Sequence, residues 1–259
     1  PLVWKVLRMP FTQAGNFLSK ACSGVDPRTG SYNAALHIAS APTGLLNGPV
    51  LELTLGYQAF STEDLGFGQG WFLHWSTYDR RDKELRSGSG ERFVVAADEI
   101  SGPLPLSQTK SPWLKFSKLG DTAYQVWHAG GIVEILSGSA NAYPVKVPTA
   151  WHGPNGAAVY FSWEASGRGY RLTSAVDSCG SRVLNVTYHG DADVELSIWP
   201  DSPYAKTVSL ILSQGQLIDM RDGDRCWKMG YDSNLSALGP ILTTVSYPEG
   251  LVETATYFS

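Results

Sequence analysis

Glycine and proline interrupt this chain throughout, with 27 glycines and 15 prolines among 259 residues. Because glycine weakens a helix interior and proline breaks it, such frequent interruption leaves little room for helices of ordinary length. Between the interruptions, apolar and polar residues alternate, which is typical of strands with one buried face. With 43% hydrophobic and 17% charged residues, the chain can also bury a core. The sequence therefore predicts an all-β fold built from antiparallel β-hairpins.

The first half of the chain contains four predicted strands. Residues 32–38 and 50–57 alternate in polarity and are predicted to pair as neighbours. Residues 71–78 are aromatic on both faces, which indicates one strand buried on both sides. The charged residues 79–86 are predicted to form a solvated turn before a strand at 92–95.

The second half is predicted to continue as a meander. Strands are expected at 114–119, 124–128, 132–136, 159–163, 171–176 and 183–188. The segment Ala129-Gly130-Gly131 is a strong hairpin signal between the second and third of these. Residues 144–148 contain two prolines, so they are predicted to be a short linker or an edge strand. Further β-branched runs follow turns near residues 217 and 242.

Two regions suggest how the chain divides. Residues 1–13 are predicted to be a vector-derived or flexible N-terminal extension, followed by one β region over 14–259. Within that region, residues 98–112 hold Gly102 and three prolines, which predicts a long surface loop and a candidate internal boundary.

Charge and composition disfavour several classes of partner. The net charge of −4 offers no basic face for nucleic acid or for an anionic membrane surface. No apolar run approaches the roughly 20 residues that a membrane-spanning helix needs, and the first residues lack the order of a classical signal peptide. The three cysteines, Cys22, Cys179 and Cys226, are far apart and odd in number, so buried reduced thiols are expected.

The sequence carries no recognisable catalytic or cofactor motif. The five histidines lack the short spacings that let two rings hold one metal ion, and no H-E-x-x-H, G-x-S-x-G or C-x-x-C occurs. The glycines Gly66, Gly68 and Gly70 resemble part of a phosphate-binding loop, but strand-like residues follow where such a loop needs a helix. We therefore expect no cofactor, and we expect these glycines to adopt positive φ beside Trp71.

Three motifs resemble the opening of the Rhs/YD-repeat family and of the related C-component (TccC-like) of insecticidal toxin complexes. The first is Gly24-Val25-Asp26-Pro27-Arg28-Thr29-Gly30-Ser31-Tyr32, in which Asp26, Pro27, Arg28 and Gly30 also make a plausible turn. The second is Gly66-Phe67-Gly68-Gln69-Gly70-Trp71, and the third is Gly90-Glu91-Arg92-Phe93. The resemblance covers residues 14–190 well and the remainder loosely, where a "L-T-x-V-x-Y-P-x-G" unit stands at 242–250.

The resemblance implies antiparallel hairpins that form a curved sheet of an Rhs/YD-repeat-like shell. It implies a structural, non-catalytic role in which the shell encloses a C-terminal toxin until delivery. The partners would then be the remainder of the shell and the enclosed toxin. The protein would be made in the bacterial cytoplasm and then be secreted or delivered to a target cell.

Two alternatives remain open. A carbohydrate-binding module would use flat aromatic faces, and Trp113, Trp151, Trp199 and Trp227 stand beside turns where they could serve. A hydrolase would need convergent polar residues that the sequence does not reveal. Independently of function, residues 251–257 are β-prone and nearly uncharged, so they are a candidate exposed edge for self-association.

Overall fold

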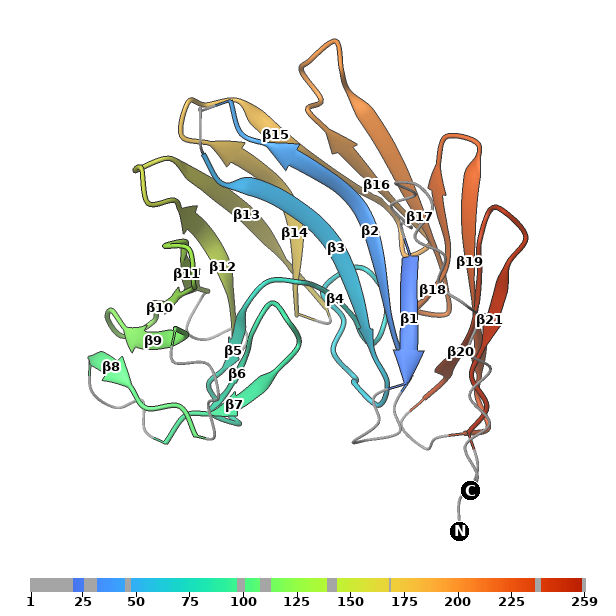
Figure 1. Ribbon diagram of the computed structural model, residues 1–259, viewed down its shortest axis with the longest axis horizontal. Helices are drawn as coiled ribbons and strands as arrows, with labels where there is room; N and C mark the ends of the chain where they lie inside the picture. The colour runs from blue at the N-terminus through green and yellow to red at the C-terminus, as the bar shows by residue number, and fades with distance from the viewer. Residues whose placement is uncertain are drawn as a thin grey trace.

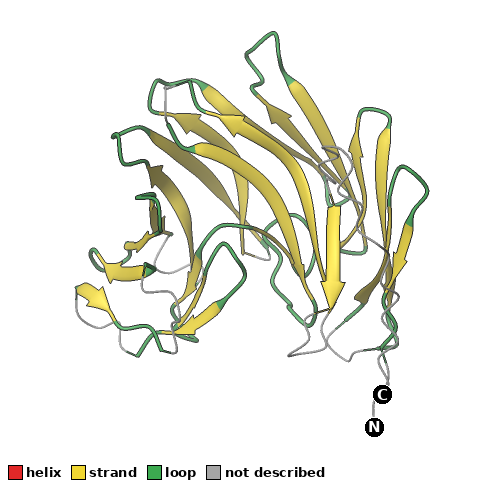
Figure 2. Ribbon diagram, viewed as in Figure 1, coloured by secondary structure: helices red, strands yellow, loops and turns green. Residues whose placement is uncertain are grey.

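The computed structural model describes residues 21–25, 32–44, 48–96, 101–107, 113–138, 144–167, 169–235 and 239–257. All helices and strands assigned within these ranges are β-strands, with no helix among them (Figure 2), which confirms the all-β prediction. The Asp26, Pro27, Arg28 and Gly30 turn and the extension at 1–13 lie outside the described residues. The strands are β1 (Ala21–Val25), β2 (Tyr32–Pro42), β3 (Val50–Gln58), β4 (Trp71–Leu73), β5 (Thr77–Asp79), β6 (Glu84–Arg86), β7 (Arg92–Val94), β8 (Gly102–Leu104), β9 (Lys115–Lys118), β10 (Tyr124–Trp127), β11 (Val133–Ser137), β12 (Val145–His152), β13 (Ala158–Ser166), β14 (Gly169–Asp177), β15 (Arg182–His189), β16 (Asp193–Ile198), β17 (Lys206–Ser213), β18 (Gln216–Asp222), β19 (Arg225–Asp232), β20 (Ile241–Ser246) and β21 (Val252–Thr254).

Two antiparallel sheets form the larger part of the molecule. Strands β1 to β4 pair in order as one sheet, and β12 to β21 pair in order as a long curved meander (Figure 1). Their apolar faces share one core, in which Leu36 and Leu55 of the small sheet join Leu172, Leu196 and Leu210 of the meander. Because strands alternate inward and outward residues, this packing requires the period-2 pattern seen in the sequence.

A smaller core lies inside a ring of short strands. Pairings run from β5 through β6 to β7, and from β8 through β9, β10 and β11 to β12, which pairs back with β5. A bridge between Val95 and Leu106 joins the ends of β7 and β8. The residues enclosed by this ring are Tyr78, Leu85, Phe93, Val95, Leu104, Phe116, Tyr124, Val126 and Leu136. Strand β12 therefore belongs both to this ring and to the long meander.

Several sequence predictions are confirmed by the pairings. The predicted neighbours are β2 and β3, which pair along most of their length. The hairpin predicted at Gly130 joins β10 to β11, and the meander predicted from residue 159 is β13, β14 and β15. Strands β16, β17 and β19 were not predicted individually. The prediction of a curved antiparallel sheet is confirmed (Figure 1).

Three predictions in the first half are wrong. Residues 71–78 form two short strands in different sheets, because the chain crosses there from the larger core to the smaller one. Residues 79–86 include strand β6, in which Arg86 is buried rather than solvated. Residues 98–112 include strand β8, whose Leu104 is part of the smaller core. The proposed domain boundary in that stretch stays a prediction.

The linker or edge strand predicted at 144–148 is instead the start of β12, which pairs with β5, β11 and β13. The ladder between β11 and β12 has a β-bulge beside this proline. Ile135 is opposite Ala150 and Leu136 is opposite Pro148, so Thr149 of β12 is the extra residue. The carbonyl of Pro148 accepts a hydrogen bond from the Trp163 indole at 2.6 Å. Proline is therefore tolerated in an interior strand, since the bulge interrupts the ladder where proline has no N–H to donate.

The predicted burial of the cysteine side chains is wrong for Cys179 and Cys226. Cys179 is exposed and Cys226 is only half-buried, so neither is a core residue. The side chain of Cys22 lies outside the described residues.

Candidate functional site

The glycine-rich segment that precedes β4 is a tight loop held by one carboxylate. The N–H groups of Gly66 and Gly68 both donate to Oδ1 of Asp64, at 2.8 and 3.1 Å. The three glycines have φ of 94°, 99° and 81°, and residues other than glycine rarely adopt such positive φ angles. The predicted positive φ is thus confirmed for Gly66, Gly68 and Gly70. Because β4 follows the loop, no helix N-terminus faces a phosphate here.

This loop lies directly against the long meander. A Cβ on Gly68 would come within 2.9 Å of the backbone nitrogen of Leu217 in β18. The N–H of Gln69 donates to the carbonyl of Gly215 at 2.8 Å, in the turn that precedes β18. The loop therefore fastens the small sheet to the meander through backbone contacts, which explains the glycines structurally.

Trp71 extends this attachment into the core. Its indole N–H donates to the hydroxyl of Tyr231 at 2.8 Å, and that hydroxyl donates to the carbonyl of Leu217 at 2.7 Å. Tyr57, whose ring lies 5.3 Å from that of Trp71, accepts from the N–H of Leu242 at 3.0 Å. Burial raises the pKa of Tyr57 to about 12 and raises that of Tyr231 well above its usual range. The predicted burial of the aromatic cluster Trp71, Phe72, Trp75 and Tyr78 is confirmed.

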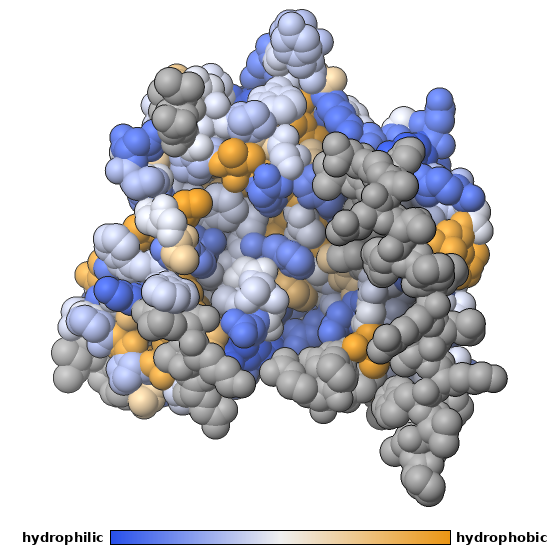
Figure 3. Space-filling view, in the orientation of Figure 1, coloured by the Kyte–Doolittle hydropathy of each residue, from blue (hydrophilic) through white to orange (hydrophobic). Residues whose placement is uncertain are grey.

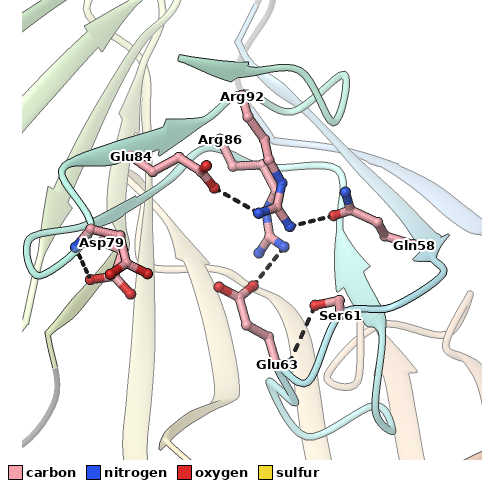
Figure 4. A network of polar contacts seen from close by, with 8 residues as sticks. Gln58, Ser61, Glu63, Asp79, Glu84, Arg86 and Arg92 are labelled. Carbon is pink, nitrogen blue, oxygen red and sulfur yellow. Dashed lines mark hydrogen bonds and ion pairs between the residues drawn. The ribbon is translucent and has the colours of Figure 1, made fainter. Parts of the chain in front are cut away.

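A polar network connects the larger core to the ring of short strands (Figure 4). The buried Arg86 of β6 forms an ion pair with Glu63 at 2.6 Å, and its guanidinium lies 4.5 Å from the Phe72 ring centre. Arg92 of β7 donates to Glu84 at 2.8 Å and to Gln58 of β3 at 2.7 Å. Burial lowers the pKa of Arg86, and the nearby Glu63 carboxylate opposes that shift. The ion pair therefore has a structural role, because it links the ring of short strands to the loop before β4.

The four tryptophans considered for sugar binding do not form one exposed platform. Trp227 and Trp151 are buried, at 1% and 7% exposed, and Trp199 is half-buried. Trp113 alone among the four is largely exposed, at 65%. Trp113 and Trp151 do, however, line the same cavity.

That cavity has a volume of about 450 Å³ and lies where the two parts of the molecule meet. Its walls come from the start of β3, the crossing between β4 and β5, the turn after β6, the residues before β9, the β10–β11 hairpin and β12. The lining residues are Val50, Glu52, His74, Ser87, Gly88, Ser89, Glu91, Trp113, Leu114, His128, Ala129, Ile132, Glu134 and Trp151. Cavities of this size accommodate small ligands.

Glu134 is the buried carboxylate in this wall. Its side chain is 6% exposed, and Oε2 accepts the N–H of Ser76 at 3.0 Å, at the point where the chain passes between the cores. Nε2 of His128 lies 3.5 Å from Oε2 and makes no hydrogen bond among the described residues. The cavity also contains His74, whose pKa burial lowers, so that its imidazole is neutral at neutral pH. None of the described lining residues is lysine or arginine.

Other chemistry is not assembled in the part of the chain that the structure describes. No group of three or more histidine, cysteine, aspartate or glutamate side chains there could hold a metal ion. No helix in those ranges is long and apolar enough to cross a membrane. Sequence reasoning missed the cavity because its walls come from six separate segments, and no local motif marks such a meeting point.

Comparison with known proteins gives a likeness of structure. No protein-family description matches the sequence, and no curated protein matches it. The crystal structure of the TcdB2–TccC3 complex matches with a TM-score of 0.51 and 12% identity over 97% of this chain. A holotoxin pore of Photorhabdus luminescens (TM-score 0.49, 14% identity, 96% of this chain and 16% of that chain) and the N-terminal domain of the effector SpvB from Salmonella typhimurium strain LT2 (0.39, 12%, 86% and 100%) also match.

The first of these likenesses shows that the chain has a fold found in a toxin-complex protein. It agrees with the resemblance to the Rhs/YD-repeat and toxin-complex families that the sequence motifs indicate. The chain spans about a sixth of the matched protein, since it covers 17% of that chain. The likeness therefore concerns one region of a much larger molecule.

Proposed function

We propose that the chain is a non-catalytic structural part of a toxin-complex-like β-shell, which encloses a C-terminal toxin until delivery. The observation that supports this most is the fold shared with the TcdB2–TccC3 complex over 97% of the chain. The partners are the remainder of the shell and the enclosed toxin. Synthesis in a bacterial cytoplasm, followed by secretion or delivery to a target cell, belongs to the same proposal.

The strand order supports growth by strand addition. From β12 to β21 each strand pairs with the next, so the meander extends in one direction along the chain. Among the described residues, β21 pairs only with β20, and the side chains of Leu251 and Val252 are exposed. A strand with one unpaired side presents backbone N–H and C=O groups that a further strand can satisfy.

The surface is consistent with a wall that does not adsorb its cargo. On the face shown in Figure 3, hydrophobic residues form small separate groups among hydrophilic ones. Large continuous apolar patches would bind an unfolded polypeptide strongly, because burial of apolar area is favourable. A mixed surface suits a container from which the cargo must later leave.

The proposal can be tested with the entire polypeptide that the gene encodes. We expect limited proteolysis followed by mass spectrometry to show a C-terminal segment that resists cleavage while the shell is intact. Trp71→Ala, which weakens the larger core, should make that segment cleavable, whereas the exposed-site control Trp113→Ala should not.

Two results would contradict the proposal. One is the lack of a protected C-terminal segment. Either the gene product has no segment beyond the shell, or that segment is cleaved equally fast in the native and the urea-unfolded protein. The other is turnover of a glycan or peptide substrate by the purified chain, which would replace the structural role with an enzymatic one.

A further inference from the structure

We propose that the cavity between the two cores binds an organic cation, with its positive group against the Glu134 carboxylate and its aliphatic part beside Trp151 and Trp113. This inference is independent of the shell role. It rests on the cavity, on the state of Glu134 within it and on the chemistry of the walls.

The register of the sheet places the two key side chains together. Glu134 of β11 is directly opposite Trp151 of β12, so both side chains lie on the same face of the sheet. Val126 of β10 is the next residue in this row and belongs to the smaller core, whereas Trp151 belongs to the larger one. Glu134 thus occupies the position where the two cores meet.

The Glu134 carboxylate is incompletely satisfied by the protein. A carboxylate offers about four acceptor positions, and this one receives a single hydrogen bond, from the N–H of Ser76. Its other oxygen, Oε1, has no partner among the described residues. Nε2 of His128 lies 3.5 Å from Oε2 without a hydrogen bond. An ammonium group bound in the cavity would donate to the carboxylate oxygen that receives no hydrogen bond from the described residues.

The surrounding walls favour a cation over a neutral or an anionic ligand. Glu52 and Glu91 add two further carboxylates, and the neutral His74 adds no positive charge. The exposed ring of Trp113 provides a face that attracts cations through its π electrons. In a ligand with an ammonium group on a short aliphatic chain, the ammonium group would bind the Glu134 carboxylate and the chain would pack beside Trp151 and Trp113. A free aliphatic amine and the lysine side chain of a peptide segment share this chemistry.

The test uses titration calorimetry of the whole chain with four probes. These are n-butylamine, N-acetyl-lysine methylamide, its uncharged norleucine counterpart and glucose. We expect saturable binding of the two amines and none of the norleucine compound or glucose. Tighter binding of n-butylamine would indicate a free amine as the natural ligand, and tighter binding of the lysine compound would indicate a peptide segment.

Three variants test the assignment of residues. Glu134→Gln keeps an oxygen for the Ser76 N–H but removes the charge, so amine affinity should fall about ten-fold or more. Trp113→Ala, at an exposed site, should weaken binding about two- to five-fold. Glu195→Gln, on β16 and outside the cavity lining, is the matched control and should bind like the parent chain. Thermal unfolding of each variant reports whether it is folded.

Three outcomes would overturn the inference. They are equal binding of glucose and the amines, unchanged amine affinity in a folded Glu134→Gln variant, and the absence of saturable amine binding to the folded parent chain. If Glu134→Gln does not fold, unchanged affinity in Trp113→Ala overturns the inference in its place.

Discussion

Replacing Trp71 by alanine tests whether the glycine loop and β4 hold the two sheets together. Trp71 is 1% exposed, packs against Tyr57 and donates to Tyr231 at 2.8 Å. Deleting a large core aromatic costs about 3–5 kcal/mol through lost burial and the cavity left behind. Since domains are typically stable by only about 5–15 kcal/mol, Trp71→Ala should lose a large part of the free energy of unfolding.

Two companion variants separate the contributions. Trp71→Phe keeps an aromatic ring but removes the indole N–H, so it should lose the hydrogen bond of about 1 kcal/mol together with part of the packing. Trp113→Ala removes a tryptophan that is 65% exposed and should change stability by less than about 0.5 kcal/mol.

Urea denaturation followed by circular dichroism measures all three variants, with the midpoint and the slope compared to those of the parent chain. We expect Trp113→Ala to be the most stable of the three variants, Trp71→Phe to be intermediate and Trp71→Ala to be the least stable. An unchanged midpoint for Trp71→Ala would refute the reasoning, because it would mean that Trp71 does not hold the small sheet against the meander.

Three further predictions concern the loop, the tyrosines and the sheet edge. Gly68→Val should abolish soluble expression, because its Cβ would meet the Leu217 backbone at 2.9 Å at a φ of 99°; a yield equal to that of the parent chain would contradict this. Stability should fall at high pH, since burial raises the pKa of Tyr57 to about 12 in the folded chain from its usual 10. The contribution is complete below pH 10 and is lost as the pH rises through about 12, and an alkaline titration that shows tyrosinate forming with no loss of stability in this range would be evidence against it. Finally, if β21 associates with a second copy, Val252→Lys should reduce concentration-dependent light scattering. The control Val94→Lys alters a residue of the same 55% exposure on β7, which pairs with β6 and is joined to the end of β8 by the bridge between Val95 and Leu106, and it should not reduce scattering. Scattering independent of concentration in the parent chain would show that the edge does not pair.

The sequence predicts best those strands that have one buried face. In β2, buried residues from Tyr32 to Ile38 alternate with more exposed ones, and in β3 the run from Leu51 to Leu55 does the same. Local alternation is sufficient there, because the partner strand and the core lie on predictable sides. The positive φ angles of the loop glycines could also be predicted, because they depend on the local sequence alone.

The errors fall where a segment serves two cores. Trp75 packs in the larger core and Tyr78 in the smaller one, so the sequence shows aromatic residues on both faces of what looks like a single strand. Arg86 looks solvated because its neighbours are charged, yet Glu63 pairs with it inside the structure. Pro148 looks like an edge residue because a β-bulge cannot be read from one strand alone.

The sequence by itself determined the all-β class, several of the hairpins and the likeness to toxin-complex proteins. These properties depend on residues close together along the chain, in alternation, turns and short motifs. Only the tertiary structure decided that there are two cores, that β12 belongs both to the ring of short strands and to the meander, and that Glu134 and Trp151 share the wall of a cavity with the distant Trp113. The physical reason is that burial depends on which segments meet in space, and a contact between residues far apart in sequence leaves no periodic signal in either of them.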